Sequence, residues 1–139
     1  MPPNAWKEFF MATWNEVKSF LKSGLNAQEV SNGNGVSMDI KFTDGRSQFV
    51  NVMKVDYKGT EWADVFSGVG VISTANLNGA LEWLLTQPCG GLIKIGDNHA
   101  VRHCIPIADL SNEEIIGPIN VLASVADTLE EKLVGGDNL

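Results

Sequence analysis

The sequence predicts an α+β fold in which helices pack on a five-stranded antiparallel sheet, in the order α-βββ-α-ββ-α. Three observations indicate this class: helical spacing of apolar residues over 5–23, strict alternation that begins after residue 35, and a helix-start motif at 111–114. No internal repeat and no long linker divides the chain. We therefore expect residues 1–139 to form a single domain.

Residues 5–23 are predicted to form the first helix, which we expect to end near Gly24. Its apolar face is richer in aromatic side chains than a helix of this length needs to pack on a sheet. We therefore expect that face to be divided between the core and an interface with another molecule. The candidate interface residues are Trp6, Phe9, Phe10, Trp14 and Phe20.

Three antiparallel strands are expected after the first helix. Apolar and polar residues alternate over 36–42, and the Asp44-Gly45 dipeptide that follows favours a tight hairpin turn. The returning strand is predicted at about 46–57. The Lys58-Gly59 turn then leads into a third strand at about 61–73.

The second half of the chain is predicted to add two helices and one hairpin. Helical spacing returns at 76–86, with Asn76 as its N-cap, and 92–107 reads as two strands joined by a turn. Ser111 and Glu114 have the spacing of a capping box, in which each side chain accepts a hydrogen bond from the other's backbone N–H. This motif predicts that the last helix begins here, and Pro118 lies inside it.

Composition and charge exclude several classes of protein. Ten basic and 17 acidic residues give a net charge of −7, which repels phosphate backbones, so a nucleic-acid partner is not expected. No apolar run approaches the ~20 residues that span a bilayer, and the first residues lack a leader pattern, so we expect no membrane partner and a cytoplasmic location. Cys89 and Cys104 are expected to be reduced thiols.

The residues that bind metals do not form a pattern suited to one ion. His99 and His103 would lie on one face of a strand but about 13 Å apart, and Cys104 would point to the opposite face. We expect no metal site, no cofactor and no catalytic residues. Ser67-Gly68-Val69-Gly70 lies in a predicted strand, where its glycines indicate a bulge or a close backbone approach and not a phosphate loop. The carboxylates near the end of the last helix oppose the helix dipole, which favours a role for that surface.

Three segments resemble the bacterial YbjN-like proteins, often described as putative sensory transduction regulators. They are the strand from Glu61-Trp62 to Ser67-x-Val69-Gly70, the strand Leu92-Ile93-Lys94-Ile95, and the ending Ala126-Asp127-x-Leu129-Glu130-Glu131-x-Leu133 with Gly135-Gly136-Asp137. The element order is similar to that of type III secretion chaperones. The resemblance implies a chaperone-like fold and a protein that dimerises and presents a sheet or helix face to an extended polypeptide. It implies no catalytic residues.

The first hypothesis is a non-enzymatic homodimeric protein-binding module, either chaperone-like or a regulatory adaptor. The alternative is a small-molecule-binding or enzymatic domain with a pocket between the sheet and a helix. That alternative gains support if polar groups such as His103, Arg102 or Asp64 converge in a deep pocket. A structural subunit of a larger assembly is a third possibility.

Overall fold

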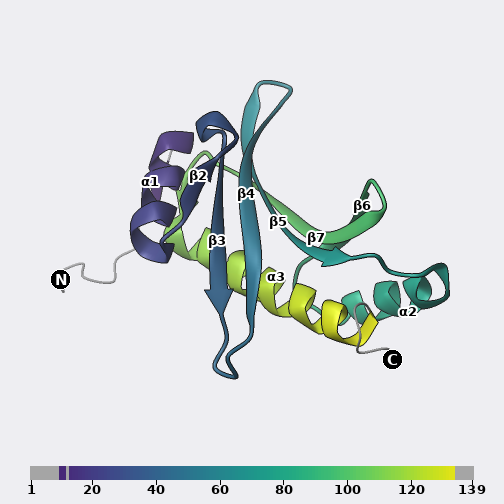
Figure 1. The fold of residues 1–139 in the computed structure, drawn as a ribbon. Helices are drawn as coiled ribbons and strands as arrows, with labels where there is room; N and C mark the ends of the chain where they lie inside the picture. Colours follow the sequence, from purple (N-terminus) through teal and green to yellow (C-terminus); the bar gives the residue numbers. More distant parts are fainter. Residues whose placement is uncertain (1–9, 12, 134–139) are drawn as a thin grey trace.

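A computed structural model describes residues 10–11 and 13–133 (Figure 1). The helices are α1 (Trp14–Leu25), α2 (Thr74–Leu84) and α3 (Asn112–Leu133), with a short 3-10 turn at Ser31–Gly33. One large sheet and one small pair of strands accompany them. The strands are β1 (Phe10–Met11), β2 (Gln28–Val30), β3 (Gly35–Lys41), β4 (Ser47–Tyr57), β5 (Thr60–Gly70), β6 (Gly91–Ile95), β7 (Asn98–Pro106) and β8 (Leu110–Ser111).

The large sheet has six strands in the order β2-β3-β4-β5-β7-β6, and every neighbouring pair is antiparallel. The α+β class is confirmed, but the expected count of five strands is wrong. The sequence analysis missed β2, which has three residues, all of them exposed. It also missed the two-residue pair β1 and β8, which forms a separate two-stranded sheet. Segments this short have no periodic signal.

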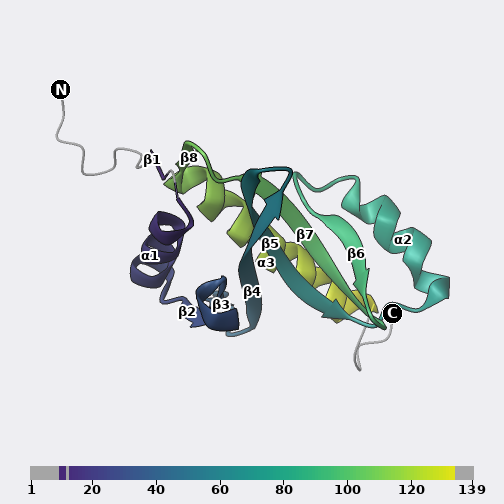
Figure 2. The same ribbon diagram turned by 90° about the horizontal axis from the view of Figure 1, so that it is seen from above.

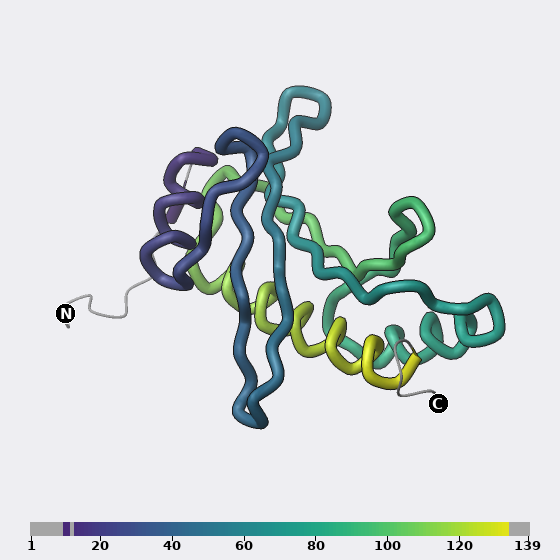
Figure 3. The backbone as a smooth tube through the Cα atoms, in the orientation of Figure 1, coloured from purple at the N-terminus to yellow at the C-terminus, as the bar shows by residue number. Residues whose placement is uncertain are grey.

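The three hairpin turns expected from the sequence are present, including the one between β6 and β7. Between β3 and β4, Gly45 has φ +89° and the Asp44 carboxylate accepts a hydrogen bond from the Arg46 N–H at 2.9 Å. Between β4 and β5, Lys58 and Gly59 both have positive φ, +50° and +83°. The β3–β4 and β4–β5 hairpins extend from the sheet at opposite ends (Figure 3).

The first helix begins later than predicted. Residues 5–9 lie outside the described residues, but Phe10 and Met11 form β1, which pairs with Ser111 and Leu110. The hydroxyl of Thr13 accepts a hydrogen bond from the Glu16 N–H at 3.2 Å, so the helix starts after this N-cap. It ends at Leu25, close to the expected end near Gly24, and its C-cap Asn26 lies in the left-handed region.

The other element boundaries differ from the predictions by a few residues. β5 ends at Gly70, and α2 begins after Ser73 and not at Asn76. The capping box is confirmed: Ser111 Oγ accepts from the Glu114 N–H at 3.1 Å, and Glu114 Oε1 accepts from the Ser111 N–H at 2.8 Å. These hydrogen bonds, first the one from the Ser111 backbone, lower the pKa of the Glu114 carboxyl.

The core lies between one face of the sheet and the helices. α3 packs across β4, β5 and β7, and α1 packs against β2 and β3 (Figures 1 and 2). Apolar residues at helical spacing on α3 meet alternate residues of the strands. The side chains fully buried in this way include Val17, Leu21, Val36, Val50, Val52, Val65, Val101, Ile115, Ile119 and Leu122.

Trp14 belongs to this core. Its side chain is only 6% exposed, and its indole N–H donates to the Gly33 carbonyl at 2.8 Å, whereas Phe10 is 64% exposed. We expect Trp14→Ala to lower the free energy of unfolding by about 3–5 kcal/mol, because it leaves a cavity. Phe10→Ala, the matched control, should change it by less than about 0.5 kcal/mol. Urea unfolding measures both, and equal losses would contradict this division of the aromatic residues.

Candidate functional site

The two faces of the sheet are unlike, and β4 shows the difference most clearly. Val50 and Val52 are fully buried against the helices. On the same strand, Phe49 is 63% exposed and Met53 is half-buried. Val52 pairs with Val36 on one side and with Val65 on the other, so these three valines share the helix-covered face. Residues at alternate positions therefore point to the other face.

In the described part of the chain, no helix packs on that second face, which we call the uncovered face (Figure 2). In most sheets with only one covered face, the residues of the other face are polar. Here several of these positions carry large apolar side chains. Phe49, Tyr57 and Ile95 are 63%, 60% and 54% exposed. The apolar residues of the uncovered face are Phe49, Met53, Val55, Tyr57, Trp62, Phe66, Ile93 and Ile95.

Two hollows mark the uncovered face. The first has a volume of about 330 Å³ and is lined by residues that include Phe66, Gly68, Ile95 and Ala100. A Cβ atom added at Gly68 would meet nothing within 4 Å, so the glycine leaves open space there. The second hollow, about 250 Å³, is lined by Val55, Tyr57, Trp62, Arg102 and Cys104.

Three polar side chains meet beside the second hollow. Arg102 Nε donates to Asp64 Oδ1 at 3.0 Å, and the Cys104 thiol donates to the same oxygen at 3.6 Å. Burial, and then the negative charge of Asp64, raise the pKa of the Cys104 thiol. The Asp64 charge also raises the pKa of Arg102. The cysteine is therefore held as a thiol and is a poor nucleophile.

Trp62 adds an unpaired donor to this region. Its indole nitrogen is buried and has no hydrogen-bond acceptor among the described residues. A buried donor in this condition costs about 1–3 kcal/mol. No pattern in the sequence indicates this unpaired donor.

The alternative hypothesis gains support if polar groups such as His103, Arg102 or Asp64 converge in a deep pocket. Arg102 and Asp64 do meet, but on the uncovered face, where they pair with each other. His103 is the register partner of Val65 and lies on the helix-covered face. The three residues therefore do not form one pocket.

The residues considered for metal binding are also separated by the fold. His99 is buried, and its Nδ1 accepts a hydrogen bond from the Ile72 N–H at 3.1 Å. Cys89 packs against the core, where burial raises the pKa of its thiol. Within residues 10–11 and 13–133, no group of three or more His, Cys, Asp or Glu side chains is placed to hold a metal ion.

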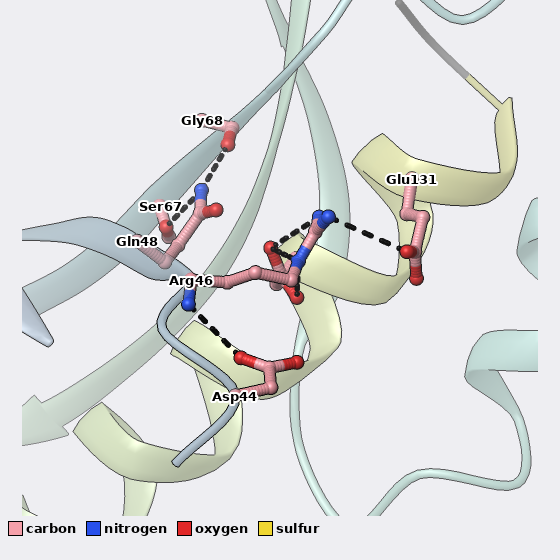
Figure 4. Close-up of polar contacts among 7 residues, drawn as sticks. Asp44, Arg46, Gln48, Ser67, Gly68 and Glu131 are labelled. Atoms are coloured by element: carbon pink, nitrogen blue, oxygen red, sulfur yellow. Dashed lines mark hydrogen bonds and ion pairs between the residues drawn. The ribbon is translucent and has the colours of Figure 1, made fainter. Parts of the chain in front are cut away.

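Ser67 and Gly68 take part in a hydrogen-bond network inside the sheet (Figure 4). The Ser67 hydroxyl donates to the Phe49 carbonyl, and Gln48 Nε2 donates to Ser67 Oγ at 3.1 Å and to the Gly68 carbonyl at 2.7 Å. The register of β5 against β7 shifts between Gly68 and Gly70, so the bulge expected from these glycines is confirmed. The serine hydroxyl therefore has a structural role.

The acidic end of the last helix has a partner that the sequence analysis did not foresee. Arg46 forms a two-pronged ion pair with Asp127, Nε to Oδ2 at 3.1 Å and Nη2 to Oδ1 at 2.9 Å, and Nη1 lies 3.4 Å from Glu131 Oε2 (Figure 4). Hydrogen bonding to Asp127 is the main cause of the raised pKa of Arg46. Although these carboxylates oppose the helix dipole, they stabilise the fold, because they hold the β3–β4 hairpin onto α3.

The candidate interface residues of the first helix are distributed over different environments. Trp14 is in the core, Phe20 is half-buried against it, and Phe10 is exposed. Trp6 and Phe9 lie outside the described residues. A hollow of about 380 Å³, which we call the first-helix hollow, is lined by Phe10, Met11, Asn15, Glu16, Ser19 and Phe20.

In the part of the chain that the structure describes, no helix is both long enough and apolar enough to cross a membrane.

The polar cluster on the uncovered face can be tested through thiol chemistry. Asp64→Asn removes a negative charge beside Cys104 and leaves Arg102 in place, so the pKa of this thiol should fall. We expect Cys104 to be alkylated several-fold faster by iodoacetamide at pH 8, as followed by peptide mass spectrometry. Cys89 is the internal control. An equal acceleration at both cysteines would indicate general loosening, and an unchanged Cys104 rate would contradict the role given to Asp64.

Comparison with known proteins gives no relative for this chain. No family model matches it, no curated protein matches it, and no solved structure matches its fold. The resemblance to YbjN-like proteins therefore rests on short sequence motifs and element order alone and stays a prediction.

Proposed function

We propose that this chain is a non-enzymatic homodimeric protein-binding module, chaperone-like or a regulatory adaptor. The observation that carries the proposal is that the fold leaves apolar surface exposed in two separate places. One is the uncovered face, with Phe49, Tyr57 and Ile95, and the other is the first-helix hollow around Phe10 and Phe20. Large apolar side chains grouped on a protein surface are typical of interfaces with other proteins.

The two surfaces differ in size and character. The uncovered face extends over several long strands, whereas the first-helix hollow is local, and the polar residues Asn15, Glu16 and Ser19 are part of its lining. A hollow of about 380 Å³ accommodates a few side chains of another polypeptide. We assign it to an extended apolar segment of a client. An adaptor needs such a site in addition to the surface through which it dimerises.

The client site can be tested with labelled, reduced insulin B chain as a probe for an unfolded apolar segment. We expect the wild-type protein to bind the probe in fluorescence anisotropy, and Phe10→Glu to weaken binding about tenfold or more, because a charge then replaces the exposed ring in the hollow. Leu85→Glu is the matched control, since Leu85 is 87% exposed at the end of α2. It should bind like the wild type.

Two results would contradict the proposed client site. One is a wild-type protein that does not bind the probe at any concentration up to its solubility. The other is Phe10→Glu that binds as tightly as Leu85→Glu.

A further inference from the structure

We propose that the uncovered face is the dimer interface, and that its occupant is a second copy of this chain packed face to face about a two-fold axis. The inference rests on the proposed function, because it names the surface through which the homodimer forms. The sequence analysis placed the interface on the first helix. Four features of the described residues favour the sheet face for this role.

The first feature is size. β4 and β5 each have 11 residues, so the face is about 36 Å long at about 3.3 Å per residue. The five neighbouring strands β3, β4, β5, β7 and β6 together span about 20 Å, because adjacent strands lie about 4.8 Å apart. A flat face of this length and width covers roughly 700 Å², and protruding side chains add to that area. Stable interfaces bury about 800 Å² on each partner.

The second feature is charge. The chain has a net charge of −7, yet the charged groups on the central strands of the uncovered face balance. Asp39 pairs with Lys41 on β3 at 3.0 Å, and Asp64 pairs with Arg102 at 3.0 Å. The excess negative charge therefore lies elsewhere on the molecule. Two acidic copies can approach through this face without placing like charges opposite each other.

The third feature is shape. Phe49 protrudes from β4, and Gly68, which lies near it on β5, lines the hollow of about 330 Å³ described above. A projection next to a depression is the arrangement that a two-fold axis makes self-complementary, because each copy then inserts its projection into the depression of the other. We place Phe49 of each copy in the open space over Gly68 of its partner. Two sheets stacked in this way are about 10 Å apart.

The fourth feature is the sheet edges. β2 has three residues and β6 has five, and the fourth residue of β6 is Lys94. Short edge strands and an edge lysine discourage pairing with another strand. The edge strands of two copies are therefore poorly suited to pair with each other, and face-to-face packing is the contact that the sheet favours.

The inference is tested by the mass of three variants in sedimentation equilibrium. Gly68→Leu fills the open space, and Phe49→Glu places a charge on the projecting position; neither touches the core. We expect the wild type to be a dimer. In both variants the dissociation constant of the dimer should be about 100-fold higher, while the far-UV circular dichroism should be unchanged. Leu85→Glu is the control and should remain a dimer. Phe49→Glu keeps the test decisive if Gly68→Leu does not fold.

Two outcomes overturn the inference: a monomeric wild type at about 100 μM, or Phe49→Glu and Gly68→Leu that stay dimeric. The insulin B chain assay separates this failure from failure of the proposed function. A monomer that still binds the probe through the first-helix hollow keeps the client site and loses the dimer interface. A dimer that dissociates in these variants but never binds the probe keeps the interface and loses the client site.

Discussion

The packing of α3 across one face of the sheet is the contact on which the rest of the structure depends. Ile115, Ile119 and Leu122 are fully buried against strands that are far apart in the sequence. The helix thereby fixes which residues of each strand belong to the core. Because a strand alternates its side chains between two faces, the same contact leaves every second residue of β4, β5 and β7 on the side without a helix.

Polar contacts support this one-sided arrangement at its margins. Arg46 joins the β3–β4 hairpin to Asp127 and Glu131 on α3, and the capping box of Ser111 and Glu114 fixes the point where α3 begins. Both contacts lie on the helix side of the sheet. On the uncovered face, by contrast, the ion pairs lie within the sheet and the large apolar side chains point outward. Folding leaves these side chains exposed, and association with another molecule would bury them.

The sequence was informative where the signal is local. The alternation over 36–42, the Asp44-Gly45 turn and the capping box depend on neighbouring residues, and all were found. β1, β2 and β8 were missed because strands of two or three residues exist only through pairing with distant partners. Arg46 and Asp127 are 81 positions apart, so no spacing rule connects them. Apolar residues at both alternating positions of β4 were visible, but the placement of α3 decides which of them are exposed.

The central claim is that one face of the sheet packs against the helices to form the core, and that the other face binds a second molecule. Adjacent residues of β4 test it directly, since Val50 is fully buried and Phe49 is 63% exposed. The measurement is the free energy of unfolding in urea for Val50→Glu and Phe49→Glu. We expect Val50→Glu to lose several kcal/mol of unfolding free energy or fail to fold, because it buries an unpaired charge. Phe49→Glu should remain a folded, stable monomer. Equal losses at the two positions would contradict the central claim.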